Sequence, residues 1–173
     1  MDVKSDDWFY EAVLWAVENR VTGGTSATTF SPDGECTRAQ VVTFLWAANG
    51  RPEPVTTDNP FKDVTVSDWY YKAVLWAAEN QITAGTSVDT FSPDETCTRA
   101  QVVTFLYAMA GRPEVEDINF FVDVADEAWY TTPIIWAVEH EITSGVGDNK
   151  FGPERTCTRA QIVLFLYKAM TEN

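Results

Sequence analysis

The sequence predicts a mainly α fold made of three helix–loop–helix repeats. Two observations support this prediction: the stretch CTRAQ occurs three times, and an apolar segment follows each copy. The copies start at residues 36, 97 and 157, so the repeat step is 61 and then 60 residues. Units of this kind usually cannot bury their apolar faces alone and depend on their neighbours. We therefore expect residues 1–173 to form a single cooperative domain.

The sequence around CTRAQ keeps the same step. In order along the repeat, the recurring residues are Trp8, Trp69 and Trp129; Trp15, Trp76 and Trp136; Gly24, Gly85 and Gly145; Phe30, Phe91 and Phe151; and Pro32, Pro93 and Pro153. Linkers containing Pro, Gly and acidic residues, GRPEPVTTDNP and GRPEVEDIN, mark the repeat boundaries. Repeat one is expected over 1–59, repeat two over 60–119 and repeat three over 120–173.

The first helix of a repeat is clearest in SDWYYKAVLWAAEN of repeat two, where apolar residues fall on one helical face. In repeat three Pro133 replaces Ala73, and proline suits the first turn of a helix rather than its interior. We therefore expect the helix to begin near residue 72, with Trp69 just before it. The tryptophan inside each of these helices is expected in the core, at Trp15, Trp76 and Trp136.

The segment that follows, QITAGTSVDTFSPDETC, is dense in Gly, Ser, Thr, Asp and Pro. This composition predicts an ordered loop, with room for a short strand. The second helix begins at CTRAQ, because Thr98 followed three residues later by Gln101 is the pattern of a capping box. It is apolar nearly all round beyond its first turn, which predicts a buried helix, and it ends at Gly111, where a left-handed cap is expected.

The three cysteines occupy equivalent positions, immediately before the capping threonines. An odd number cannot close completely into internal disulfides. We interpret each cysteine as a small hydrophobe that closes a hydrophobic staple on the residue at N4 of the following helix. The pairs are Cys36 with Val41, Cys97 with Val102 and Cys157 with Ile162. The alternative, a zinc site of cysteines on a threefold axis, lacks the fourth ligand and the close ligand pairs that zinc generally requires.

Composition excludes several function classes. The net charge is −14, with 26 acidic and 12 basic residues, so nucleic acid is not an expected partner. No apolar run approaches the roughly 18 residues of a membrane helix, so no membrane insertion is expected. The only histidine, His140, aligns with Asn19 and Asn80 and belongs to no repeated site. We therefore expect no catalytic residue, no cofactor and no metal.

The pattern F-x-D-V, then W-Y, an Ala-rich helix, I-T-x-G, F-x-P and T-R-A-Q runs through repeats two and three, with one local exception: Val-Gly-Asp follows Gly145. Repeat one lacks the opening Phe. The chain resembles a tandem of three S-layer homology repeats over essentially its whole length. The resemblance implies a pseudo-threefold spindle with the capped helices bundled at the centre. It also implies an extracellular location, at the bacterial cell wall and surface layer.

The resemblance further implies a function, which is non-covalent anchoring of an exported protein by binding to secondary cell-wall polysaccharide. The ligand of such repeats is typically pyruvylated, with a ketal carboxylate on N-acetylmannosamine. The alternative function is a protein-interaction or self-assembly module that uses the same grooves. Because the opening MDVKSDDWFY lacks a signal peptide's pattern and repeat one lacks its Phe, we expect a monomeric domain of a larger protein.

With this resemblance, three sets of residues are candidate ligand-binding groups. The arginines at the first helical position would pair with the carboxylate, aided by the amides and dipole of the helix N-terminus. The tryptophans before the first helices would offer a flat face to a sugar ring, and the loop glycines would let the backbone approach the sugar. The candidates are Arg38, Arg99 and Arg159; Trp8, Trp69 and Trp129; and Gly24, Gly85 and Gly145.

Each candidate also has a structural interpretation. A first-turn arginine is ordinarily solvated, so its replacement with alanine is expected to leave the fold nearly unchanged. The tryptophans are as readily explained by packing as by sugar binding, and the glycines by the turn alone. The motif glutamines, Gln40, Gln101 and Gln161, are explained by the capping box, which we prefer to a ligand role.

Overall fold

The computed structural model describes residues 2–116 and 118–171. Within these residues the regular elements are helices, which confirms the mainly α prediction, and they alternate between short outer helices and longer capped ones. The elements are α1 (Tyr10–Glu18), α2 (Arg38–Ala48), α3 (Tyr71–Glu79), α4 (Arg99–Met109), α5 (Thr131–Glu139) and α6 (Arg159–Thr171). No helix in this part of the chain is long and apolar enough to cross a membrane.

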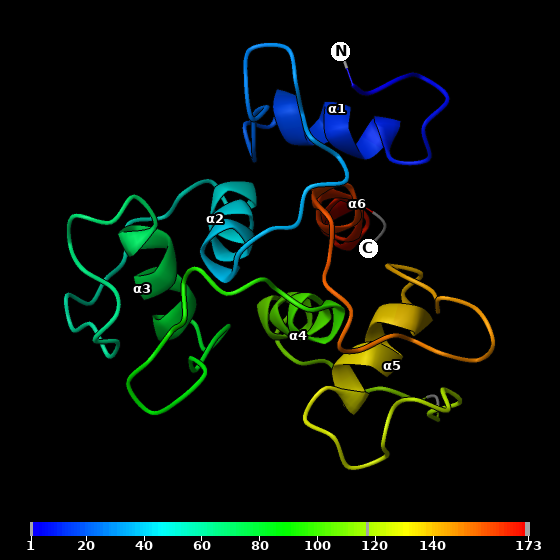
Figure 1. The fold of residues 1–173 in the computed structure, drawn as a ribbon. Coiled ribbons are helices and arrows are strands. Elements are labelled where there is room, and N and C mark those ends of the chain that lie inside the picture. Colours follow the sequence, from blue (N-terminus) through cyan, green and yellow to red (C-terminus); the bar gives the residue numbers. More distant parts are fainter. Residues whose placement is uncertain (1, 117, 172–173) are drawn as a thin grey trace.

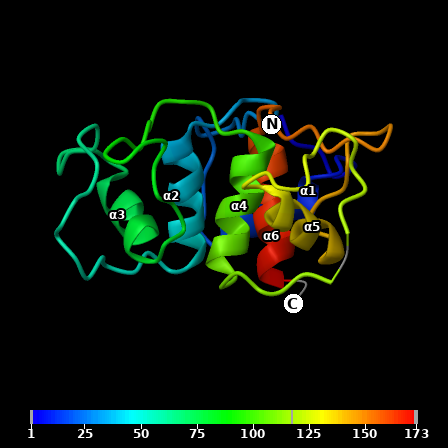
Figure 2. The same ribbon diagram turned by 90° about the horizontal axis from the view of Figure 1, so that it is seen from below.

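The capped helices α2, α4 and α6 contact one another pairwise. Figure 1 views them nearly end-on in the middle of the molecule, and Figure 2 shows them side by side with roughly parallel axes. Each outer helix packs on the capped helix of another repeat: α3 on α2, α5 on α4, and α1 on α6. The last pair joins the first repeat to the third, so the helix packing closes on itself around the three repeats.

Capping boxes start the central helices, as the sequence predicts. The Thr37 hydroxyl accepts a hydrogen bond from the Gln40 amide (3.3 Å), and the Gln40 side chain accepts from the Thr37 amide (3.0 Å). The same reciprocal pair forms between Thr98 and Gln101 and between Thr158 and Gln161. These boxes orient the first residue of the helix, which is the motif arginine in every repeat.

The first two amides of each capped helix are not available to an anion, which corrects the expectation from the sequence. The amides of Arg38 and Ala39 donate to the carbonyls of Glu95 (2.9 Å) and Pro93 (3.1 Å), in the loop of repeat two. In the same way the loop of repeat three caps α4, and the loop of repeat one caps α6. The sequence pattern misses this because the acceptors lie in a different repeat.

This mutual capping forms a closed ring of hydrogen bonds. The Cys97 amide donates to the Cys36 carbonyl (2.9 Å), and the Cys157 amide donates to the Cys97 carbonyl (3.0 Å). In the loops between the helices, the described residues form isolated β-bridges rather than a strand, including the inter-repeat bridges Thr37–Thr96, Thr98–Thr156 and Glu35–Thr158. The loop of each repeat therefore supplies the acceptors that cap the first turn of the helix of the preceding repeat, and the loop of repeat one does so for repeat three.

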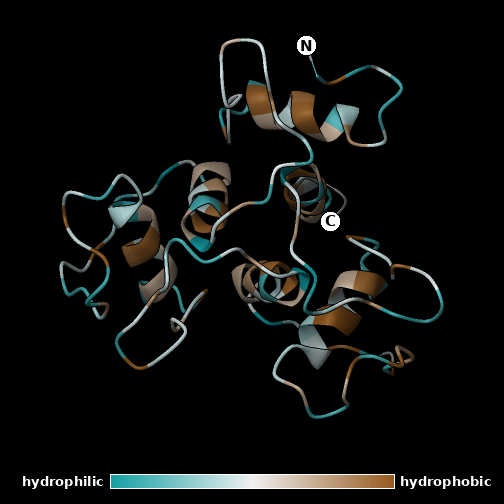
Figure 3. Cartoon of the chain, in the orientation of Figure 1, coloured by the Kyte–Doolittle hydropathy of each residue, from teal (hydrophilic) through white to brown (hydrophobic). Residues whose placement is uncertain are grey.

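The most hydrophobic residues are concentrated in the helices, while the loops are mainly polar (Figure 3). Trp76 and Trp136 are buried in the core as expected, whereas Trp15 is half-buried and packs on Tyr167 of α6. All three cysteines are reduced and fully buried. The N4 residues Val41, Val102 and Ile162 are fully buried as well. Their burial agrees with the hydrophobic-staple interpretation.

The aspartate of F-x-D-V fixes each loop to the start of its own repeat. The Asp63 carboxylate accepts hydrogen bonds from the amides of Phe91 (2.8 Å) and Ser92 (2.7 Å). Asp2 and Asp123 make the equivalent pairs of bonds. The phenylalanine placed in this way packs beneath the motif arginine, so the aspartate indirectly positions the candidate site.

Candidate binding grooves

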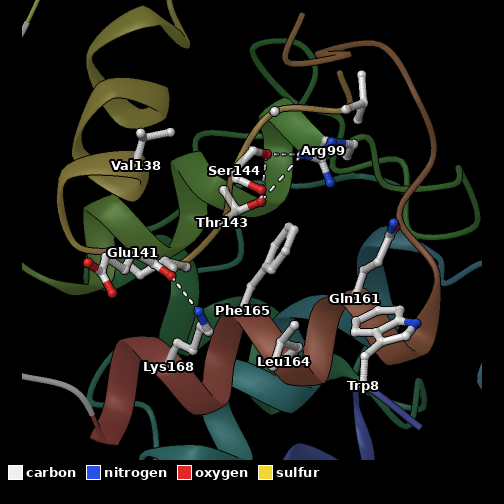
Figure 4. A pocket seen from close by; sticks show the side chains of 13 residues that line it. Trp8, Arg99, Val138, Glu141, Thr143, Ser144, Gln161, Leu164, Phe165 and Lys168 are labelled. Atoms are coloured by element: carbon white, nitrogen blue, oxygen red, sulfur yellow. Dashed lines mark hydrogen bonds between the residues drawn. The ribbon is translucent and has the colours of Figure 1, made fainter. Parts of the chain in front are cut away.

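Two grooves lie between the repeats, and each takes residues from all three. The first, called here the Arg99 groove, encloses about 520 Å³. Repeat two contributes Arg99, repeat three contributes loop residues 141–146 and one face of α6, and repeat one contributes Trp8. Figure 4 shows Arg99 at one end of this groove and Trp8 at another, with α6 forming its floor.

The second groove, called here the Arg38 groove, is built in the same way and encloses about 490 Å³. Repeat one contributes Arg38, repeat two contributes loop residues 82–86 and one face of α4, and repeat three contributes Trp129. Both volumes fall within the roughly 300–1,000 Å³ typical of small-molecule sites. In both grooves the structure brings together the arginine, glycine and tryptophan that the sequence singled out.

The third set, Arg159, Gly24 and Trp69, follows the same order around the repeats. Arg159 meets the loop of repeat one, where its Nη2 donates to the hydroxyl of Thr22 (3.2 Å) and the carbonyl of Gly23 (3.0 Å). Trp69 is 65% exposed, like its counterparts. That Trp69 lies beside Arg159 as Trp8 lies beside Arg99 stays a prediction.

The motif arginines are buried rather than solvated, which corrects the structural interpretation made from the sequence. Arg38, Arg99 and Arg159 are only 2%, 4% and 6% exposed. Each guanidinium lies between two phenylalanine rings; for Arg99 these are Phe151 and Phe165, at 4.7 and 5.4 Å from the ring centroids. A guanidinium favours such aromatic faces because it is planar and weakly hydrated. Replacing these arginines with alanine should therefore destabilise the fold.

Burial also affects the charge of these groups. Desolvation lowers the pKa of Arg38 and of Arg99 from the usual value. Arginine nevertheless stays protonated in proteins. Each groove thus contains a permanent positive charge in a low-dielectric setting, where its attraction for an anion is stronger than in water.

The hydrogen bonds of Arg99 are made within the fold. Its Nε donates to the Phe151 carbonyl (3.1 Å). Its Nη2 donates to the Thr143 hydroxyl (3.3 Å) and the Ser144 carbonyl (3.0 Å), and Figure 4 draws these two bonds. Arg159 makes the equivalent hydrogen bonds, and its Nε donates to the Phe30 carbonyl (3.0 Å). Neither Nη2 is left without an acceptor.

Arg38 differs from the other two. Its Nε donates to the Phe91 carbonyl (2.8 Å), as expected from the repeat. Its Nη2, however, is buried and has no hydrogen-bond partner among the described residues. A buried donor without an acceptor costs about 1–3 kcal/mol, so this atom calls for an explanation.

The pre-helix tryptophans are exposed, at 62% for Trp8 and 61% for Trp129. Each makes an edge-to-face contact with the next residue, so Trp8 packs on Phe9 and Trp129 on Tyr130, at ring centroid distances of 4.9 and 5.0 Å. This contact holds one side of the indole while a broad face stays open to the groove. The packing explanation therefore covers only part of the ring surface.

The turn itself requires the loop glycines. A Cβ on Gly85 would lie 2.4 Å from the Thr90 carbonyl oxygen, and one on Gly145 would lie 2.5 Å from that of Lys150. Gly24 is equally confined, at 2.3 Å from the Thr29 carbonyl oxygen. These distances explain the glycines without a ligand, and a role in sugar approach stays a prediction.

The structure adds groove residues that the sequence interpretation missed. Gln101 and Gln161 line the Arg38 and Arg99 grooves, because only the Oε1 end of each side chain is used by the capping box. The glutamine recurs in every copy of CTRAQ, but the sequence analysis assigned it to the capping box alone. Thr104 lines the Arg38 groove and Lys168 lines the Arg99 groove; neither lies in the repeated motif.

The cysteines do not line the two grooves and are chemically quiet. Desolvation raises the pKa of Cys36 to about 11 and that of Cys157 to about 12, and also raises that of Cys97. Thiols with such values are scarcely ionised at neutral pH and react slowly. Among residues 2–116 and 118–171, no group of three or more His, Cys, Asp or Glu is placed to hold a metal ion.

All three repeats match one protein family, over residues 2–42, 60–103 and 120–163. The chain belongs to the S-layer homology domain family. As an S-layer homology domain it is an extracellular module, associated with the bacterial cell surface and cell wall.

The chain matches only part of the length of the proteins to which it is similar. The chain is 32% identical over 171 residues to an endoglucanase of Bacillus sp. (strain KSM-635), covering 92% of the chain and 17% of that protein. It is 25% identical over 148 residues to a cellulosome-anchoring protein of Acetivibrio thermocellus, covering 82% and 33%. It is 24% identical over 170 residues to an S-layer protein of Bacillus thuringiensis subsp. finitimus, covering 96% and 21%. The chain thus spans at most a third of these relatives, and the match to the endoglucanase assigns no catalysis to it.

Proposed function

We propose that this chain anchors the protein to which it belongs to the bacterial cell wall by binding secondary cell-wall polysaccharide non-covalently. The observation that supports this most directly is the composition of the two grooves. Each combines a buried cation, an exposed tryptophan face, and hydroxyl and amide groups, drawn from three different repeats. These are the groups that an acidic sugar requires: a partner for its carboxylate, a flat face for its ring, and polar groups for its hydroxyls.

The ligand proposed is a pyruvylated amino sugar of the polymer, whose ketal carboxylate pairs with the motif arginine. The chain has a net charge of −14, so its surface as a whole repels an acidic polymer. Binding then depends on local sites in which a cation is shielded from the surrounding acids. The relatives named for S-layer and cellulosome anchoring agree with an anchoring role.

The proposal includes the architecture that builds these sites: one cooperative domain over 1–173, arranged as a pseudo-threefold spindle around a bundle of α2, α4 and α6. The pairwise contacts of these helices and the cyclic capping of their first turns support it. Since the Arg38 and Arg99 grooves each take residues from three repeats, an isolated repeat would contain neither site.

Binding to purified wall polymer tests the function, with the tryptophans as the clean variants because they are exposed. The Trp8→Ala, Trp129→Ala double variant should fold normally and lose at least about thirtyfold in affinity, which corresponds to about 2 kcal/mol for an aromatic anchor. Phe120→Ala is the matched control, because this aromatic is 57% exposed and is not among the lining residues of either groove.

The same polymer, stripped of its pyruvyl groups by mild acid, tests the ligand. The parent protein should bind it far more weakly than the intact polymer. Equal binding to both polymers would refute a role for the carboxylate, and unimpaired binding by the double variant would refute the grooves.

A further inference from the structure

The three cysteines lie opposite one another where the repeats meet. Antiparallel bridges join the segments that carry them, at Thr37–Thr96, Thr98–Thr156 and Glu35–Thr158. In an antiparallel pair, the residue after one bridge position lies opposite the residue before the other. The bridges therefore place Cys36 opposite Cys97, Cys97 opposite Cys157, and Cys157 opposite Cys36.

This register brings every pair of cysteines within the range of a disulfide. Opposite residues of an antiparallel pair have Cα atoms about 4.5–5.5 Å apart, and disulfides join Cα atoms about 4.4–6.8 Å apart. All three cysteines are 0% exposed and belong to one hydrophobic cluster. Burial raises the pKa of Cys97, and the neighbouring thiols of Cys157 and Cys36 raise it further. The three thiols thus share one interior space.

The location of the chain makes oxidation of these thiols relevant. An S-layer homology domain is an extracellular module, and disulfides form and persist outside the cell, whereas cytosolic thiols are kept reduced. Three thiols that converge in an extracellular domain therefore meet oxidising conditions while the chain folds. Because their number is odd, at most one disulfide forms within a chain.

The pair Cys36–Cys157 differs from the other two in its backbone. The Cys97 amide donates to the Cys36 carbonyl (2.9 Å), and the Cys157 amide donates to the Cys97 carbonyl (3.0 Å). Among the described residues, no equivalent hydrogen bond joins the Cys36 amide to the Cys157 carbonyl. A disulfide has a specific geometry, and the pair without a direct backbone bond is the freest to adopt it. Burial also raises the pKa of Cys36 less than that of the other two thiols, to about 11, so Cys36 ionises most readily.

We propose that these cysteines form one disulfide, between Cys36 and Cys157, which ties repeat one covalently to repeat three and leaves Cys97 as a free thiol. The structure describes the reduced form. Linkers already join repeat one to repeat two and repeat two to repeat three. Repeats one and three, in contrast, meet through non-covalent contacts, with α1 packed on α6 (Figure 1). The Arg99 groove spans this junction, because Trp8 comes from repeat one and Gln161 from repeat three. The disulfide therefore holds this groove together as well as the fold.

The bond forms while the chain folds, because thiols that are already buried react slowly. The oxidant is a low-molecular-weight disulfide. The Cys36 thiolate attacks one sulfur of this disulfide and releases the other as a thiolate. The Cys157 thiolate then attacks the Cys36 sulfur of the mixed disulfide and releases the second thiolate. The two cysteines lose two protons and two electrons, and the oxidant becomes two thiols.

Oxidative refolding of the parent chain tests the pairing. The chain is unfolded in urea with a reductant, refolded in reduced and oxidised glutathione, and then alkylated with N-ethylmaleimide in urea. We expect one alkylated cysteine per chain, at Cys97, and a Cys36–Cys157 linked peptide in the mass spectrum of a digest. A linked peptide that contains Cys97 would overturn the assignment to the junction of repeats one and three. Three alkylated cysteines per chain, or a disulfide-linked dimer on a non-reducing gel, would overturn the disulfide itself.

Stability gives a second readout. The disulfide closes a loop of 121 residues (157 minus 36), so the oxidised chain should unfold at a urea concentration at least about 1 M above that of the reduced chain. Cys97→Ala is the matched variant, because it keeps the proposed pair and should keep the full difference between the oxidised and reduced midpoints. The Cys36→Ala, Cys157→Ala double variant controls for the reductant and should show no difference. Loss of the difference in Cys97→Ala would mean that Cys97 belongs to the bond, contrary to the proposal. If either variant fails to fold, the pairing found in the parent chain decides the question.

Discussion

The Arg38 groove and the Arg99 groove are built from equivalent residues, yet they offer a ligand different hydrogen-bonding groups. In the Arg99 groove the loop satisfies the arginine, and in the Arg38 groove it leaves Nη2 without a partner. The difference arises from the orientation of one peptide rather than from the CTRAQ motif, which is identical in both. Threefold repetition in a sequence thus does not imply threefold equivalence in local structure.

The largest expected effect on stability comes from a deletion that removes both grooves together. Deleting repeat three, residues 120–173, takes away the carbonyls of Pro153 and Arg155 that cap α4, and it takes away α6, on which α1 packs. We expect the remainder to lose its cooperative thermal transition when followed by circular dichroism, because the ring of contacts is opened. A sharp transition near the temperature of the full chain would show that the repeats fold independently.

The next largest effect is the loss of folding stability when Arg99 or Arg38 is replaced with alanine. Arg99→Ala removes three hydrogen bonds, to Phe151, Thr143 and Ser144, so it should cost about 4 kcal/mol. Arg38→Ala removes one bond and also an unsatisfied donor, so it should cost about 2 kcal/mol. Urea unfolding of both variants measures the difference. An equal or larger cost for Arg38→Ala would contradict the presence of an unsatisfied donor at Arg38.

The burial of these arginines could not be predicted from the sequence, and the reason is physical. Arg38 bonds to the carbonyl of Phe91, 53 residues away in another repeat, and no local pattern records that contact. The capping box, by contrast, involves residues only three apart, so Thr37 and Gln40 predicted it correctly. The sequence therefore predicted which residues start the helices but not what covers them.

The residues that line the grooves were likewise predicted only in part. A shared step of 60 or 61 residues singled out arginine, tryptophan and glycine, but it could not show that the members of one groove come from different repeats. The Gly85 φ of +85° has no counterpart at Gly145, although both are glycines in the same motif. Backbone orientation of this kind depends on packing around the loop, which a single sequence does not reveal.

A smaller effect tests the core that both grooves share. Burial raises the pKa of the Cys36 thiol from its usual value of 9.0 to about 11. The neutral buried thiol therefore contributes its full share to stability below pH 9, and this contribution is lost as the pH rises toward the pKa of the folded state. Stability should therefore fall above pH 9 by about 1.4 kcal/mol per pH unit for each thiol. Urea unfolding between pH 8 and about pH 10.5 measures the slope.

Cys36→Ala supplies the control for this slope. The variant should lose one thiol's share of the pH dependence, whatever its stability at pH 8. A slope identical to that of the parent would show that the thiol does not titrate on unfolding as its burial requires.

The smallest effect is one in which the two grooves should not differ. The hydroxyls of Thr37 and Thr98 accept the same capping bond at the same length, 3.3 Å. Thr37→Ala and Thr98→Ala should therefore each cost about 1 kcal/mol of stability. Denaturation midpoints that differ widely between the two variants would mean that the repeats differ in more than the backbone of the loop glycine.

The most direct measurement of the central claim is a crystal structure of the chain with one equivalent of pyruvylated N-acetylmannosamine. The account predicts the sugar in the Arg38 groove or the Arg99 groove, with its ring against the tryptophan of that groove and its carboxylate within hydrogen-bonding distance of the arginine. A sugar bound outside both grooves, or a carboxylate that contacts neither arginine, would contradict it.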